Sequence, residues 1–210
     1  RLDYKWVMQL HNFVEGLQSK LMDKEGCLIH GVKDLKQEGN ITTLTFDNLL
    51  DMDHYSKSVH DYYYSKLSEK EIVCLVFDHH WWHILYPEKE YMDDLLNKRF
   101  YCVCKNNTLL DKTGNEFKKT LGMNVTFNSD IGTGNIAVYG DVVIQSFISE
   151  DISKELNNFF NKTKSLKDLA APQFVKNILH KKGKIIVLIN KNAELAAQLR
   201  QKAMNCFKKR

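Results

Sequence analysis

Short apolar runs alternate with longer amphipathic stretches along this 210-residue chain. Ile72–Phe77 and Ile185–Ile189 are apolar at every position over the length of a strand, which is typical of strands buried on both faces of a sheet. Ile41–Phe46 is rich in β-branched residues and predicts another strand. The remaining strands that we expect are Cys27–Val32, Phe100–Cys104 and Val125–Phe127.

Helices are predicted where apolar residues recur at spacings of three and four. Trp6 and Leu10 begin such a pattern near the start of the chain, and Leu195 and Leu199 belong to one near its end. Gly122 is expected to end a helix in the left-handed conformation. The expected helices are Leu2–Met22, Leu49–Leu67, Pro87–Asn97, Thr108–Leu121, Asp151–Phe160, Phe174–His180 and Asn192–Cys206.

A hairpin is predicted at Asn135–Phe147, where Tyr139, Gly140 and Asp141 interrupt two apolar runs. A Gly-Asp pair between short strands favours a tight antiparallel turn. Elsewhere strands and helices alternate, which is typical of the connections between parallel strands. The predicted fold class is therefore α/β, with a mainly parallel sheet, helices on both faces and an antiparallel hairpin near one edge.

The length suits one medium-sized domain with an appendage. We divide the chain into an N-terminal helix or linker at residues 1–25, an α/β domain at residues 26–170 and a basic helix–strand–helix segment at residues 171–210. The last segment completes the domain or is appended to it, and Ala171-Pro172 marks its boundary. Because the chain begins with Arg1 rather than Met, we expect it to be a fragment of a longer protein.

The composition predicts a cytoplasmic protein with no membrane partner. No apolar run approaches the roughly 20 residues that span a bilayer, and no signal peptide is visible. Three of the five cysteines, Cys74, Cys102 and Cys104, lie in predicted buried strands. We expect them to be reduced core residues rather than members of a disulfide framework.

Positive charge is concentrated in the last quarter of the chain. From Lys162 to Arg210, 13 Lys and Arg stand against two acidic residues, a net charge of +11. The chain as a whole carries +4, so the preceding part carries −7. Such asymmetry predicts contact with nucleic acid, or else a solvated lysine-rich surface. The candidate nucleic-acid-binding residues are Lys181, Lys182, Lys184, Arg200, Lys202, Lys208, Lys209 and Arg210.

Titratable and aromatic side chains follow the strand Ile72–Phe77 directly. In open α/β sheets ligands bind beyond the carboxyl ends of strands, and paired tryptophans suit stacking on a sugar, a base or another planar molecule. The alternative is simple packing of these rings at the domain edge. The predicted ligand-binding residues are Asp78, His79, His80, Trp81, Trp82 and His83, with Tyr139 and Asp141 as neighbours.

A metal site is the alternative chemistry for the same segment. His79 and His83 are four residues apart, so on a helix they would share one face, as zinc or iron ligands do. Asp78 would add a carboxylate ligand or orient one imidazole ring. The glutamate of the His-Glu-x-x-His protease helix is missing. These three residues would serve a metal-dependent hydrolase or nuclease, whereas the main hypothesis requires no metal and no cofactor.

The hairpin region resembles the effector-binding half of archaeal TrmB-like transcriptional regulators, whose C-terminal domains are phospholipase-D-like. The resemblance covers Glu71–Lys164, under half of the chain, with the same order of strands and helices. In that family a strand is followed by a hairpin with a Tyr-Gly-Asp turn. The matching residues are Asn135, Ile136, Val138, Tyr139, Gly140, Asp141, Val142, Ile144 and Ser146.

Two departures from that family bear on function. The winged helix-turn-helix of such regulators is not visible, so it would precede Arg1, with Leu2–Met22 as its connecting helix. The phospholipase-D signature, His-x-Lys followed by Asp, is incomplete, because after His180 and Lys182 the Asp position holds Val187. The resemblance therefore implies a sensor that shifts a DNA-binding domain and has no catalysis of its own.

The main hypothesis is thus a non-enzymatic ligand-sensing domain of a cytoplasmic transcriptional regulator, acting as a homodimer. Its partners would be a small-molecule effector and DNA, the latter bound through a segment outside this chain. The alternatives are the metal-dependent hydrolase or nuclease and a nucleic-acid-binding module that uses the basic C-terminal segment.

Overall fold

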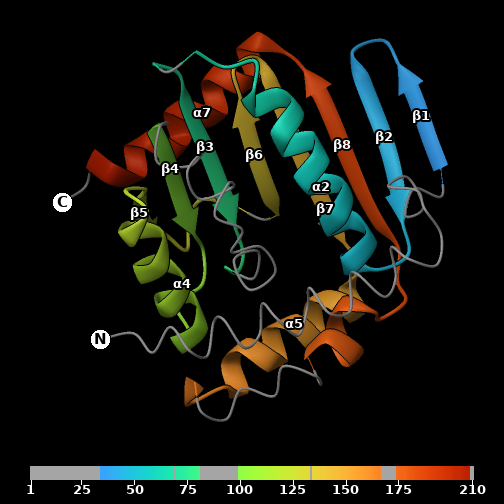
Figure 1. Ribbon diagram of the computed structural model, residues 1–210, viewed down its shortest axis with the longest axis vertical. Helices are drawn as coiled ribbons and strands as arrows, with labels where there is room; N and C mark the ends of the chain where they lie inside the picture. The colour runs from blue at the N-terminus through green and yellow to red at the C-terminus, as the bar shows by residue number, and fades with distance from the viewer. Residues whose placement is uncertain (1–33, 69, 81–98, 133, 167–173, 209–210) are drawn as a thin grey trace.

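The structure is a computed structural model that describes residues 34–68, 70–80, 99–132, 134–166 and 174–208. In these residues eight strands form one sheet in the order β1-β2-β8-β7-β6-β3-β4-β5 (Figure 1). The strands are β1 (Asp34–Glu38), β2 (Ile41–Phe46), β3 (Ile72–Phe77), β4 (Arg99–Cys104), β5 (Asn124–Phe127), β6 (Asn135–Tyr139), β7 (Val142–Ile148) and β8 (Ile185–Lys191).

Helices lie on both faces of this sheet, as predicted. α7 packs on one face through buried Ala196 and Ala203, which contact a cluster of apolar residues from β3, β4, β6 and β7. α2 covers the other face over β2 and β8, with α5 and the short η3 beside it (Figure 1). The helices are α2 (Leu49–Tyr64), α4 (Leu109–Thr120), α5 (Glu150–Lys162), η3 (Val175–Leu179, π-helical) and α7 (Ala193–Lys208).

The prediction of a mainly parallel sheet is wrong. Five of the seven neighbouring strand pairs are antiparallel, and only β3–β4 and β4–β5 are parallel. The reason is that strands joined by a helix are not always neighbours. α2 links β2 to β3, yet β8, β7 and β6 lie between those two strands in the sheet. Alternating helices and strands predicted the layers correctly but not the strand directions.

The β6–β7 hairpin is confirmed, but it lies in the middle of the sheet rather than near an edge. Its two-residue turn begins with Gly140, whose φ of +54° suits the first turn position of a type II′ hairpin. The edge beside β2 is instead formed by β1, which the sequence analysis missed. β1 reads Asp-Leu-Lys-Gln-Glu, a polar composition that protects an edge strand from pairing with other chains.

Several predictions fall outside the described residues. They are the helices Leu2–Met22 and Pro87–Asn97, the strand Cys27–Val32 and the boundary at Ala171-Pro172. Within the described part, β8 of the C-terminal segment lies between β2 and β7, inside the same sheet as the rest.

The membrane and cysteine predictions can be compared with the described residues as well. No helix in residues 34–208, apart from the gaps given above, is long and apolar enough to cross a bilayer. Four cysteines carry free thiols, namely Cys74, Cys102, Cys104 and Cys206.

Candidate functional site

The segment that the sequence singled out lies at the carboxyl ends of the parallel strands β3 and β4. The backbone N–H groups of Lys105 and Asn106, which follow β4, donate to the carbonyls of Phe77 and Asp78 at the end of β3. His79 and His80 are each only 1% exposed. The two histidines therefore belong to a closed polar cluster and do not line an open site.

Asp111 is the centre of this cluster. α4 begins with a capping box in which the Thr108 side chain accepts from the Asp111 N–H, and the Asp111 carboxylate accepts from the Thr108 N–H. The same carboxylate lies 3.1 Å from His79 Nδ1 and accepts from the His80 N–H at 3.0 Å. One fully buried side chain thus caps a helix and fixes the segment after β3.

The other ring nitrogen of His79 is also occupied. His79 Nε2 lies 2.8 Å from Asn157 Oδ1 on α5 and 3.4 Å from Asn106 Nδ2. The Phe160 ring, also from α5, lies 4.2 Å from the imidazole, centroid to centroid. Both nitrogens of His79 have protein partners, so this imidazole is held in place and its coordination of a metal would require these contacts to break.

The electrostatics of Asp111 follow from the same contacts. Burial by itself would raise the pKa of this carboxyl. The hydrogen bond and electrostatic attraction of the His79 ring, the Thr108 hydroxyl and the His80 N–H together outweigh burial, and the pKa ends below its ordinary value. Asp111 is therefore a carboxylate at neutral pH and stabilises the cluster as an anion.

Lys118, two turns along α4 from Asp111, is the second charged group in this region and is 6% exposed. Its Nζ lies 3.0 Å from His80 Nδ1 and donates to Cys102 Sγ at 3.1 Å. Burial raises the pKa of the Cys102 thiol, and the charge of Lys118 opposes that rise. Sequence reasoning missed Asp111 and Lys118. The Thr-x-x-Asp spacing at the start of α4 was the signal for the first of them.

The remaining residues of the predicted segment are less constrained or outside the described chain. Asp78 is more exposed than the histidines, and its carboxylate lies 4.0 Å from Lys105 Nζ. Trp81, Trp82 and His83 lie outside the described residues. Among the residues that the structure does describe, no group of three His, Cys, Asp or Glu side chains is placed to hold a metal ion.

Tyr139 and Asp141, the predicted neighbours, lie near the opposite end of β3. Val138 of β6 pairs with Cys74 of β3. Asp78 comes four residues after Cys74, just past the end of β3, a distance of about 13 Å at the rise of a strand. The structure therefore does not bring the hairpin turn next to the cluster around His79.

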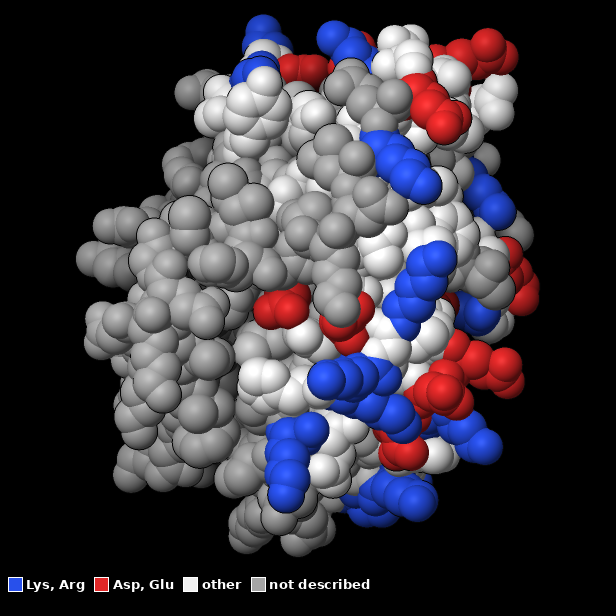
Figure 2. Space-filling model, turned by 90° about the vertical axis from the view of Figure 1, so that its right-hand side faces the viewer, with Lys and Arg blue, Asp and Glu red and all other residues white. Residues whose placement is uncertain are grey.

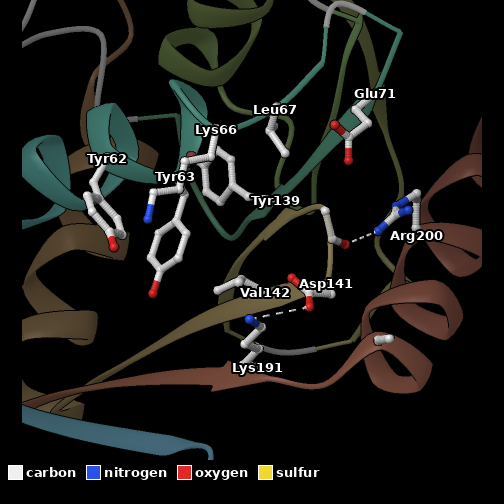
Figure 3. Close-up of a pocket in the computed structure, with 12 residues that line it drawn as sticks. Tyr62, Tyr63, Lys66, Leu67, Glu71, Tyr139, Asp141, Val142, Lys191 and Arg200 are labelled. Carbon is white, nitrogen blue, oxygen red and sulfur yellow. Dashed lines mark hydrogen bonds and ion pairs between the residues drawn. The ribbon is translucent and has the colours of Figure 1, made fainter.

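The turn instead contributes to a pocket of about 680 Å³. This volume lies inside the range of roughly 300–1,000 Å³ that is usual for small-molecule sites. Three parts of the fold meet there: the end of α2 with the residues after it, the β6–β7 turn, and the β8–α7 connection with α7 (Figure 3). The lining residues are Tyr62, Tyr63, Lys66, Leu67, Glu71, Tyr139, Gly140, Asp141, Val142, Lys191, Ala193 and Arg200.

Aromatic rings form one wall of this pocket, which we call the tyrosine pocket. The rings of Tyr62 and Tyr63 are 5.1 Å apart and perpendicular, and Tyr63 stacks on Tyr139 at 6.5 Å. The Lys66 ammonium lies 3.5 Å from the centroid of the Tyr62 ring. The hydrogen bond and charge of Lys66 lower the pKa of the Tyr62 phenol, whereas burial raises that of Tyr63.

Of the eight basic residues predicted to bind nucleic acid, the six that the structure describes are not gathered on one surface. Lys184 precedes β8 and Lys191 ends it, so the length of the strand, about 23 Å, separates Lys181, Lys182 and Lys184 from the start of α7. Arg200 lines the tyrosine pocket, and Lys202 and Lys208 lie farther along α7. Lys209 and Arg210 lie outside the described residues.

The charges on the face at the β1 edge are mixed. Figure 2 shows Lys and Arg side chains spread along this face with Asp and Glu side chains between them. A continuous basic stripe, such as a nucleic-acid backbone would follow, is not seen among the described residues of this face.

No protein-family model matches the sequence, and a search of curated proteins finds no match. Among solved structures the chain is similar to TrmBL2, an archaeal chromatin protein with a novel mode of DNA binding, at 11% identity and a TM-score of 0.45. It is also similar to NucT from Helicobacter pylori, at 9% identity and a TM-score of 0.41. The alignments cover 98% of this chain and 66% of TrmBL2, and 80% of this chain and 96% of NucT. The chain thus spans about two thirds of the length of TrmBL2.

Proposed function

We propose that this chain is a non-enzymatic ligand-binding domain with a regulatory role, and that its effector occupies the tyrosine pocket. The observation that carries the proposal is the position of that pocket. A molecule bound there would contact α2 on one face of the sheet, α7 on the other and the β6–β7 turn between them. Binding would stabilise one arrangement of these three elements relative to others, which is how a ligand shifts a conformational equilibrium.

The resemblance of the hairpin suggests what the domain acts on when its ligand binds. Asn135–Ser146 carries the resemblance to TrmB-like regulators, in which the effector domain acts on a DNA-binding domain. We propose the same relationship here, with DNA bound through a segment outside this chain. Two of the residues in that hairpin, Tyr139 and Asp141, line the tyrosine pocket.

The closed cluster at the other end of β3 gives less support to catalysis. A hydrolase that used His79 would need one of its nitrogens to reach a metal or a substrate. Asp111 and Asn157 bind those two nitrogens, and the ring is almost fully buried. The polar atoms of His79 and Asp111 are bound by other groups of the protein, as in a cluster that stabilises a fold.

The proposal can be tested by thermal denaturation of the chain with a panel of sugars, nucleosides, nucleotides, amino acids and aromatic acids. A ligand at about 100 times its Kd adds about 2.7 kcal/mol to the free energy of unfolding, which for a domain of this size corresponds to roughly 5–10 °C in Tm. We expect the shift to disappear in Tyr62→Ala. It should persist in Phe147→Ala, a control that removes another exposed aromatic ring, outside the pocket.

A third variant tests at which end of β3 the effector binds. Asp78→Asn changes the most exposed described carboxylate near the originally predicted site. If the ligand-induced shift is lost in Asp78→Asn but kept in Tyr62→Ala, the effector binds at Asp78–His83 and the proposed location is wrong. If no compound in the panel shifts Tm, the proposed function itself is not supported.

A further inference from the structure

The tyrosine pocket contains more positive charge than its own carboxylates neutralise. Three cationic side chains line it, Lys66, Lys191 and Arg200, against the two carboxylates of Glu71 and Asp141. A small binding site with an excess of one charge favours ligands of the opposite charge.

The two carboxylates do not form strong ion pairs with the cations of the pocket. Glu71 accepts the Ser68 N–H at 2.6 Å and so closes the turn before β3. Asp141 is 4.0 Å from Lys191 Nζ, and both side chains are at least half exposed. An exposed ion pair at that distance contributes little free energy, so Lys191 is available to another anion.

Arg200 has the largest unused hydrogen-bonding capacity in the pocket. Its guanidinium has five N–H donors, and the one hydrogen bond found for it in the described chain runs from Nη2 to the Gly140 carbonyl (Figure 3). Its Nε is shielded from solvent and has no hydrogen-bond partner in the part of the chain that the structure describes. Among the described residues, no carboxylate lies within 4.0 Å of this guanidinium. A planar guanidinium in this state matches the geometry of a carboxylate or a phosphate.

The N-terminus of α7 adds to the positive electrostatic potential in the pocket. Ala193 lines the pocket, and a 16-residue helix carries a partial positive charge at its N-terminus. Asn192 caps the helix by accepting the Leu195 N–H at 3.0 Å. The helix start, Lys191 and Arg200 therefore contribute positive potential from one side of the pocket.

The opposite side offers a flat apolar surface. Tyr62 is 56% exposed, which is the largest exposure of any big hydrophobic side chain in the described chain. It belongs to α2, whereas the positive groups at Lys191 and Arg200 belong to β8 and α7 (Figure 3). An exposed aromatic ring at the mouth of a pocket suits contact with a second ring.

We infer that the ligand of the tyrosine pocket is a small molecule that joins a flat ring to a compact anionic group, either a phosphate or a carboxylate. The anion binds Arg200 and Lys191, and the ring packs against Tyr62 and Tyr63. This inference rests on the proposed function, since it names the class of effector that the pocket selects.

The test uses matched pairs of anionic and neutral probes with the whole chain. Adenosine 5′-monophosphate is compared with adenosine, and benzoate with benzamide, by thermal shift and calorimetric titration at up to about 10 mM. We expect one anionic member, which identifies phosphate or carboxylate, to bind at least about tenfold more tightly than its neutral partner. That affinity should fall as the salt concentration rises.

Variants of Arg200 connect the affinity to the pocket. Arg200→Gln should weaken the anionic probe by roughly 10- to 100-fold, because a charge-assisted hydrogen bond is lost. Arg200→Lys should retain part of the affinity. Lys112→Gln, which removes an exposed charge on α4, should leave it unchanged. Because Arg200 is only partly buried, both Arg200 variants should melt within a few degrees of the wild type.

Each opposite result has a distinct meaning. Equal binding of the neutral and anionic partners would overturn the anionic class. Anion binding that survives Arg200→Gln would overturn the binding of the anion by Arg200. Either result would leave a Tyr62-dependent effector site in place. Failure of all four probes would also overturn the inference. Failure of every compound in the wider panel would remove the proposed function with it.

Discussion

The two ends of β3 both gather polar side chains, but they satisfy them in different ways. At the carboxyl end, Asp111 is fully buried and accepts from the cluster's own residues. At the amino end, Arg200 is only partly buried, and its guanidinium donates one hydrogen bond within the described residues, to the Gly140 carbonyl. A buried carboxylate whose two oxygens are both bound within the protein stabilises the fold, whereas a cation with unused donors is suited to a ligand.

The open pocket lies at the opposite end of β3 from the one expected in a sheet that contains parallel strands. Ligands ordinarily bind beyond the carboxyl ends of such strands. Here only β3, β4 and β5 are parallel, and α5 supplies Asn157 and Phe160 to close the region beyond their ends. The antiparallel hairpin, in contrast, ends in a short turn beside α2 and α7 and leaves a pocket between them.

The strongest test of the comparison is Asp111→Ala. Removing the carboxylate leaves the His79 ring and the His80 N–H buried without their acceptor, and it also removes the acceptor of the partly buried Thr108 N–H. We expect the free energy of unfolding, measured with urea at pH 7, to fall by about 3–5 kcal/mol.

Glu116→Ala is the matched control for Asp111→Ala. It removes a carboxylate from the same helix, but one that is 56% exposed and pairs only with Lys119. It should change the free energy of unfolding by less than about 0.5 kcal/mol. If Asp111→Ala were equally mild, the cluster would not be a stabilising network and His79 would again be a candidate for chemistry.

Acid provides a second test that leaves the shape of the cluster intact. The pKa of Asp111 lies below its ordinary value of 3.8, so its ionised form is the one that the folded state prefers. Its contribution to stability is therefore present above about pH 4 and is lost as the pH falls through the lower, folded pKa. Asp111→Asn abolishes this dependence because the amide does not titrate.

The measurement is the difference in the free energy of unfolding between the wild type and Asp111→Asn. It should stay constant from about pH 7 to pH 5 and shrink in more acidic solution. A difference that grew as the pH fell would show that burial dominates and that the folded pKa of Asp111 is raised.

Local patterns predicted the elements of this fold well. The apolar runs at Ile41–Phe46 and Ile72–Phe77 coincide with β2 and β3, and the Gly-Asp pair at Gly140 forms the hairpin turn. Strand direction was not predictable in the same way, because it depends on which strands become neighbours. β8, which separates β2 from β7, comes from residues more than 130 positions after β2.

At the candidate sites, too, local features were predictable from the sequence, whereas contacts between distant elements were not. The sequence showed titratable side chains directly after β3, and two of them, His79 and His80, lie in the polar cluster around Asp111. It could not show that Asn157, 78 residues after His79, would occupy the ring nitrogen. Tyr139 and Asp141 were predicted as neighbours of the segment after β3, yet they line a pocket that also needs Tyr62 from α2 and Arg200 from α7. No spacing rule joins residues from elements so far apart in the chain.

The mildest test compares two glycines in equivalent turns. Gly39, between β1 and β2, and Gly140, between β6 and β7, have φ values of +59° and +54° and each begins a two-residue turn. Alanine in this conformation costs about 1–2 kcal/mol at either position. At Gly39 an added Cβ would meet no atom within 4 Å, so Gly39→Ala measures the backbone cost alone.

At Gly140 the added Cβ would lie 3.3 Å from Leu67 Cδ2 and 3.4 Å from Glu71 Oε1, both ends of flexible side chains that line the tyrosine pocket. If this end of β3 is open to a ligand, those side chains can move aside. Gly140→Ala should then destabilise the chain by the same amount as Gly39→Ala, to within about 0.5 kcal/mol in urea unfolding. A much larger loss would mean that the pocket end is packed as rigidly as the cluster around Asp111. Ligand entry would then require the surrounding side chains to repack. The two ends of β3 would differ in their charges but not in how tightly they are packed.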